Sequence, residues 1–160
     1  MLLRYLLLFY FTLIIGCATA NGPAFKRVEH APENNAVVYI YRKDMGHWQS
    51  AYSPTLIVDN VEVASMPREG VLELTISSGQ HTFGYRHNFM AGYKPVNLDL
   101  EILSGKIYYL KISDPISFGS EYSLHDVVYR SEIAVIEEQS ALNELATTKF
   151  VTPNQTYKSN

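Results

Sequence analysis

Cysteine is almost absent from this sequence, and basic blocks and glycine-rich phosphate loops are missing. One cysteine among 160 residues excludes an intramolecular disulfide framework and any cysteine-rich zinc module. The 13 basic and 16 acidic residues form no lysine and arginine block, so the chain offers no electrostatic footprint for a nucleic-acid backbone. The sequence therefore disfavours nucleic acid as a partner and predicts neither a cofactor nor a metal site.

The apolar content is sufficient for one folded domain. Hydrophobic residues make up 47% of the chain and charged residues 18%. This balance predicts a real core rather than intrinsic disorder. A length of 160 residues fits one domain of ordinary size.

The amino-terminal segment is typical of a secretory signal. An almost unbroken apolar run covers residues 5–15 and follows a single basic residue, Arg4. A helix of that length rises roughly 16 Å, against a hydrocarbon core of roughly 30 Å, so a membrane span is not expected. The only cysteine follows directly, in the sequence Ile14-Ile15-Gly16-Cys17.

This tetrapeptide resembles a bacterial lipobox. The resemblance implies cleavage between Gly16 and Cys17, thioether lipidation of Cys17 and acylation of the new amino terminus. Each acyl CH₂ adds about 0.8 kcal/mol of membrane affinity, so two or three chains hold a protein stably on a bilayer. Residue 18 is Ala rather than the Asp typical of inner-membrane retention, which by the same resemblance favours the outer membrane, facing the periplasm. The alternative is that Cys17 ends an ordinary signal peptide or is a buried free thiol.

Composition divides the chain into four segments. The tether contains Gly22, Pro23 and Pro32, and the tail is polar and lacks a hydrophobic period. The predicted segments are a signal peptide over 1–16, a lipidated cysteine and tether over 17–35, a β-domain over 36–147 and a flexible tail over 148–160.

Short strands follow the tether at a spacing of roughly ten residues. The run 36–42 is apolar on both faces, which predicts a central strand. Asp59-Asn60 suits the positive φ angles of a type I′ turn and predicts a hairpin of 54–58 with 61–65. Short turns predict a second hairpin of 71–76 with 80–86 and a third of 96–102 with 107–113.

The carboxy-terminal part changes to a helical pattern. Residues 137–147 carry an apolar stripe and begin with Glu137-Glu138, whose negative charge suits a helix amino terminus. We expect this helix to cover a sheet edge. Seven or eight strands with tight turns predict an antiparallel β-sandwich, or a partly open barrel, with one short carboxy-terminal helix.

The order of motifs resembles a bacterial envelope lipoprotein domain of uncharacterised function, and its turns are similar to those of PEGA-type surface β-domains. The resemblance covers roughly residues 36–146. It implies a β-fold and no known active site. The motifs that carry it are VVYIYR at 37–42, SPTLIVD at 53–59, SGQH at 78–81 and SGKIYYL at 104–110.

The residues that could suggest catalysis or metal binding have simpler interpretations. His81 and His87 share one strand face but lie about 20 Å apart along it, too far for one metal ion. We expect His81 to be half-buried and hydrogen-bonded. Asp99 and Glu101 lie on the polar face of an alternating strand, which predicts a solvated surface. The pair His125-Asp126 has no recognisable nucleophile context. The sequence therefore favours a protein that is not an enzyme.

The long connections predict a binding end. If consecutive strands alternate in direction, the connections 44–53, 67–70, 88–95 and 114–124 fall at one end of the domain. They carry the amphipathic aromatic residues that dominate binding hot spots. The alternative is that these side chains fold back and plug the open end of the sandwich. The candidate binding residues are Trp48, Tyr52, Phe89, Tyr93, Phe118 and Tyr122.

Together these patterns predict a lipid-anchored envelope lipoprotein that acts as a binding module on the periplasmic side. An envelope protein, a glycan and a small ligand stay open as partners. A structural envelope component without a discrete ligand is the alternative function.

Overall fold

The computed structural model describes most of the chain after residue 18. The described residues are 19–43, 52–87, 95–114, 116–118, 127–129, 131–154 and 157, with side chains omitted for 116–118 and 127–129. Cys17 and the cleavage position at Gly16 lie outside this part of the chain. No helix within it combines the length and apolarity needed to cross a membrane.

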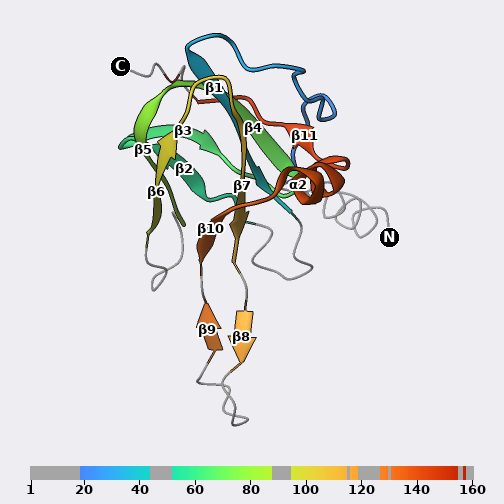
Figure 1. Cartoon of the computed structure of the whole chain (residues 1–160). Helices are drawn as coiled ribbons and strands as arrows, with labels where there is room; N and C mark the ends of the chain where they lie inside the picture. Colours follow the sequence, from blue (N-terminus) through green and yellow to red (C-terminus); the bar gives the residue numbers. More distant parts are fainter. Residues whose placement is uncertain are drawn as a thin grey trace, which may run out of the picture.

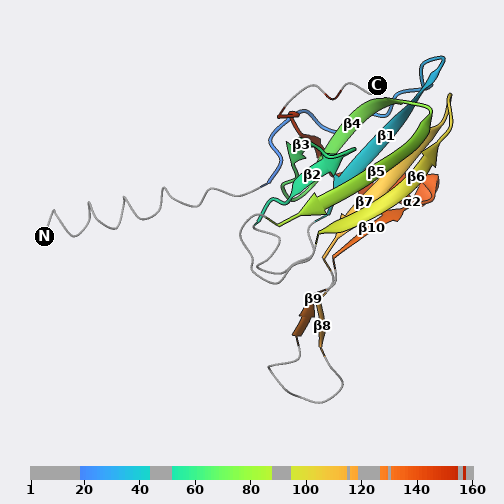
Figure 2. The ribbon, with the colours of Figure 1, turned by 90° about the vertical axis from the view of Figure 1, so that its left-hand side faces the viewer.

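Two sheets pack face to face, as the sequence predicts, and form an all-β sandwich (Figure 2). The first sheet has five strands in the order β10 (Glu132–Val135), β7 (Ile107–Ser113), β1 (Asn35–Arg42), β4 (Gly70–Ser77) and β11 (Lys149–Phe150). The second has four strands in the order β3 (Val61–Ser65), β2 (Thr55–Val58), β5 (Gly79–Arg86) and β6 (Val96–Ile102).

A separate two-stranded hairpin projects from one end of the sandwich (Figure 1). Its strands are β8 (Ile116–Phe118) and β9 (Val127–Tyr129), which pair antiparallel. The hairpin belongs to the connection between β7 and β10 and forms a sheet of its own.

The central position of β1 is confirmed. It pairs antiparallel with β4 and parallel with β7, and its side chains from Ala36 to Arg42 are all buried. One set, including Val38 and Ile40, faces the core between the two sheets. The other set, including Tyr39, lies under an outer layer. A strand covered on both faces needs apolar residues on both, which is the pattern in its sequence.

Helix α2 (Glu138–Leu145) forms part of that outer layer. The Glu137 side chain caps it by accepting hydrogen bonds from the backbone N–H groups of Gln139 and Ser140, as expected of a negative charge at this end. Ala141 and Leu145 pack on the outer face of the five-stranded sheet. The helix therefore covers a sheet face, and the expectation that it covers an edge is wrong.

Of the three predicted hairpins, one is confirmed. Strands β2 and β3 pair antiparallel, and both residues of their turn, Asp59 and Asn60, have positive φ. The predicted second and third hairpins are wrong, because β4 and β5 lie in different sheets, as do β6 and β7. A short connection that joins two strands, each with one face toward the core, permits a crossing between sheets as readily as a hairpin.

The sandwich has two unlike ends, called here the loop end and the turn end. At the turn end the connections 59–60, 78 and 103–106 are short. At the loop end the connections 43–54, 66–69, 87–95 and 114–131 leave the sheets, because Arg42 pairs with Gly70 and Ile112, and Arg86 with Thr55. The predicted segregation of the long connections at one end is therefore confirmed.

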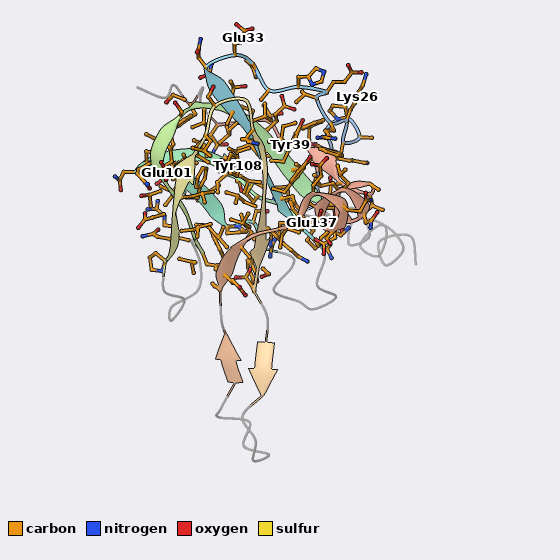
Figure 3. All side chains as sticks on the ribbon, in the orientation of Figure 1. Lys26, Glu33, Tyr39, Glu101, Tyr108 and Glu137 are labelled. Carbon is orange, nitrogen blue, oxygen red and sulfur yellow. The ribbon has the colours of Figure 1, made fainter. Side chains whose placement is uncertain are left out.

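Residues before β1 lie against the outer layer rather than hanging free. Phe25 contacts Tyr39 edge to face, with ring centroids 5.1 Å apart, and Phe150 at 5.9 Å. The backbone N–H of Val28 donates to the Tyr39 hydroxyl at 2.8 Å. The segment predicted as a tether is thus docked on the domain from residue 19 onward. Figure 3 shows Lys26 and Glu33 reaching outward while Tyr39 lies inside.

The predicted flexible tail is also wrong for most of its described residues. Strand β11 pairs parallel with β4, and the Asn154 N–H donates to the Val63 carbonyl at 2.8 Å. The Tyr157 hydroxyl then bonds the Asp59 carboxylate. Residues 149–154 and 157, called here the strap, therefore connect the first sheet with the second along one side of the sandwich.

Candidate functional site

A buried polar cluster lies at the loop end. The Asp114 carboxylate is its centre, and it is 2% exposed. Its Oδ1 atom lies 2.8 Å from the Tyr85 hydroxyl, 3.0 Å from His87 Nε2 and 2.9 Å from Ser131 Oγ. Its Oδ2 atom lies 3.7 Å from Arg42 Nη2. We call these five residues the Asp114 cluster.

The cluster joins both sheets. Arg42 ends β1 and Asp114 follows β7 in the first sheet, whereas Tyr85 belongs to β5 in the second. The Tyr85 hydroxyl also lies 2.8 Å from the Ser113 carbonyl oxygen and accepts from the backbone N–H of Glu132. The polar contacts therefore tie the two layers together where the hydrophobic core ends.

Every long connection begins or ends beside this cluster. The segment 43–51 follows Arg42, the segment 88–94 follows His87, and the hairpin-bearing segment lies between Asp114 and Ser131. Arg42 Nη1 also donates to the carbonyl oxygens of Tyr52 at 2.6 Å and Met66 at 3.4 Å. One buried guanidinium thus positions the stems of several connections.

Burial and charge set the protonation of the cluster. Burial raises the pKa of the Asp114 carboxyl, but the hydrogen bond and charge of His87, with the hydroxyls of Tyr85 and Ser131, outweigh it and leave the pKa below its usual value. Burial and the neighbouring Asp114 charge raise the pKa of Tyr85. The cluster therefore holds an ionised carboxylate and a neutral phenol at neutral pH.

The arrangement suits positioning better than catalysis. In a hydrolase triad the imidazole lies between the nucleophile and the acid. Here Ser131 and His87 both contact the same oxygen of Asp114, so the carboxylate lies between hydroxyl and imidazole. The Arg42 guanidinium and the His87 imidazole are also buried, at 2% exposure for Arg42 and 4% for the His87 side chain. Such a network fixes backbone segments in place.

Two of the predicted binding residues lie within the described part of the chain. Tyr52 is 36% exposed at the loop end, and its carbonyl accepts from Arg42. Phe118 is the last residue of β8, where only the backbone is described. The others, Trp48, Phe89, Tyr93 and Tyr122, lie outside the described residues, as does the pair His125-Asp126. The structure thus places Tyr52 and Phe118 at or beyond the loop end.

At the turn end the predicted hydrogen bonding of His81 is confirmed, but the residue is buried rather than half-buried. It is 8% exposed, with Nδ1 2.7 Å from Asp59 Oδ2 and Nε2 3.0 Å from the Ser77 carbonyl oxygen. Burial raises the pKa of Asp59, but hydrogen bonds from Tyr157, His81 and the Thr82 N–H lower it further than burial raises it. Asp99 and Glu101 are exposed, as the alternation of β6 predicts.

Two open hollows lie in the described surface. A depression of about 260 Å³ lies at the loop end beside Thr19, Ser53 and Pro67. Another of about 270 Å³ lies near Arg27, Lys106 and Glu138. Within the described ranges, no three His, Cys, Asp or Glu side chains are arranged to hold a metal ion.

Sequence reasoning missed the Asp114 cluster. A usable signal was the pair of opposite charges that follow two apolar strands, Arg42 after residues 36–41 and Asp114 after 107–113. The two strands are neighbours in a parallel pair, so their carboxyl ends meet at one end of the sheet. The predicted hairpin of β6 with β7 hid this arrangement.

Comparison with known proteins finds no matching family model, no similar curated sequence and no similar solved structure. The lipobox and the envelope-lipoprotein resemblance therefore stay predictions from the sequence, and the function is argued from the fold and the loop end.

Proposed function

We propose that this chain is a lipid-anchored bacterial envelope lipoprotein that acts as a binding module on the periplasmic side, with the loop end as its interaction surface. Anchoring rests on the lipobox-like sequence that ends at Cys17. A binding module requires only a rigid fold that holds an exposed surface in place.

The observation that carries the proposal is the place of the buried charges. Removing a carboxylate and a guanidinium from water is costly and is balanced only by pairing and further hydrogen bonds. This domain places such a pair, Asp114 with Arg42, where the long connections leave the sheets. Rigid stems at the base of variable connections are the usual construction of a binding surface.

The amino-acid composition of the long connections also favours the loop end as the interaction surface. By sequence, the connections carry Trp48, Phe89, Tyr93 and Tyr122, and Tyr52 is partly exposed there. Aromatic residues of this kind supply large contact area at low entropic cost. The turn end has short connections instead.

Intact mass and membrane fractionation test the anchor. The wild-type protein should carry the acyl mass and float with outer membrane, whereas the Cys17→Ser variant should be released without it. A wild-type protein found soluble and unmodified would contradict the anchor.

A matched pair of exposed residues tests the surface. We expect Tyr52→Ser to weaken retention of the unlipidated domain on isolated envelopes at least threefold, while Leu103→Ser at the turn end leaves it unchanged. Leu103 is 53% exposed, and both residues keep their backbone hydrogen bonds when the side chain is shortened. Equal retention of both variants, with unchanged melting temperatures, would favour a structural component without a ligand.

A further inference from the structure

We propose that the loop end faces the same bilayer that holds the anchor, and that the membrane surface is its ligand. This inference rests on the proposed lipidation of Cys17 and adds an orientation and a partner to the proposed function. It follows from where the docked amino-terminal segment begins.

The docked segment starts at the loop end. Thr19 forms a parallel bridge with Arg68, and the Ala20 N–H donates to the Arg68 carbonyl at 3.0 Å. Arg68 belongs to the connection between β3 and β4, which is a loop-end connection. Thr19 also lines a depression together with Ser53 and Pro67. Thr19 therefore lies beside the start of β2, where the blue segment begins in Figure 2.

From Thr19 the chain is held along its course up the sandwich. Ala24 forms a bridge with Lys149, and the Phe25 N–H donates to the Thr148 carbonyl at 3.0 Å. Gly22 passes so close that a Cβ there would lie 2.1 Å from the Phe150 carbonyl oxygen. This close approach requires glycine. The segment is therefore part of the domain and adds no free length to the anchor.

Only a short link is left between lipid and domain. Thr19 is the second residue after Cys17, and two extended residues span about 7 Å. A free tether that reached β1 would instead have a root-mean-square length of roughly 25 Å. The lipid must therefore lie close to Thr19, and the loop end lies close to the lipid.

In this orientation the projecting hairpin reaches the bilayer. Strands β8 and β9 leave the sandwich at the loop end (Figure 1), and three strand residues add about 10 Å. A link of about 7 Å cannot hold this projection clear of the bilayer when the loop end faces it. Contact with lipid is then an intramolecular event at high effective concentration, so a weak affinity of the loop end suffices.

Two single-cysteine labels test the orientation in the full-length lipidated protein. Lipidation blocks the native thiol, so Ser53→Cys and Leu103→Cys each carry one fluorophore, at the loop end and the turn end. The protein is reconstituted into phospholipid vesicles that contain a headgroup quencher. We expect quenching at position 53 to exceed that at position 103 at least threefold. Equal quenching, or stronger quenching at position 103, in protein that floats with the vesicles would overturn the orientation.

A longer link tests lipid as the ligand. A flexible insertion of about 20 glycine and serine residues between Ala18 and Thr19 gives roughly 25 Å of free length. Because the loop end itself binds lipid, we expect position 53 to stay the more strongly quenched. Equal quenching of the two labels in this variant would overturn lipid as the ligand. So would a label at position 53 that is unquenched on lipid while a cross-linker there captures an envelope protein in cells. A protein without acyl mass that fails to float would instead refute the proposed anchor.

Discussion

Each end of the sandwich holds an aspartate paired with a histidine, and the two pairs have different surroundings. At the loop end the side chains of Asp114 and His87 are 2% and 4% exposed. At the turn end those of Asp59 and His81 are 34% and 8% exposed. The buried pair is also contacted by Arg42, Tyr85 and Ser131, whereas the other pair lies beside a two-residue turn. Long connections need a buried anchor that local turns do not.

Removing each carboxylate should give the largest contrast. Asp114→Ala leaves the Arg42 guanidinium buried without its partner, and breaking a buried pair in this way costs about 3–5 kcal/mol. Asp59→Ala removes partly exposed hydrogen bonds and should cost about 1 kcal/mol. Urea unfolding of the two variants measures both free energies. Equal losses of unfolding free energy would show that the two aspartate–histidine pairs stabilise the fold to the same extent.

The pH dependence of stability should separate the same two groups. The folded-state pKa of both Asp114 and Asp59 lies below the usual 3.8, so each carboxylate stabilises the fold above that value. As the pH falls below 3.8, the unfolded chain takes up protons first, and stability is lost until the folded pKa is passed.

Conservative amide variants identify the source of that loss. Asp114→Asn should flatten the acid limb of the stability curve more than Asp59→Asn, because the buried group accepts more long-range contacts. Thermal melting between about pH 5 and pH 2.5 measures the slopes. An unchanged slope in Asp114→Asn would mean that its carboxylate is not a source of the acid loss.

The smallest effect on stability is expected at the turn between β2 and β3. Asn60 has a φ of 65°, a conformation that costs most side chains about 1–2 kcal/mol. Asn60→Ala should therefore lower stability by about 1 kcal/mol, and Asn60→Gly by less than about 0.5 kcal/mol. Chemical denaturation distinguishes the two variants. An Ala variant as stable as the Gly variant would show that this turn is not conformationally demanding.

Local signals predicted the features that depend on neighbouring residues. The apolar faces of 36–42 indicated a central strand. Asp59-Asn60 indicated the turn between β2 and β3, and Glu137 indicated a helix start. Each depends on contacts or dihedral angles within a few residues, or on burial of one whole strand. These predictions needed no knowledge of which strands become neighbours.

Features that depend on strand order could not be predicted in this way. The turn after Ser77 uses Gly79 at a φ of 139° and sends the chain into the other sheet, although its sequence resembles a hairpin turn. The core-facing residues of β4 and β5 therefore face each other across the core. The Asp114 cluster depends on the same order, because its members come from strands that are distant in the sequence.

The parallel pair of β1 with β7 has a consequence for how the chain acquires its structure. Val37 pairs with Ile107, so the central strand lacks one neighbour until more than two thirds of the chain has been made. The strap, which follows α2 in the sequence, joins the two sheets through Tyr157 and Asp59. Folds dominated by such distant contacts close slowly. We expect the nascent chain to stay open at least until β7 has been synthesised.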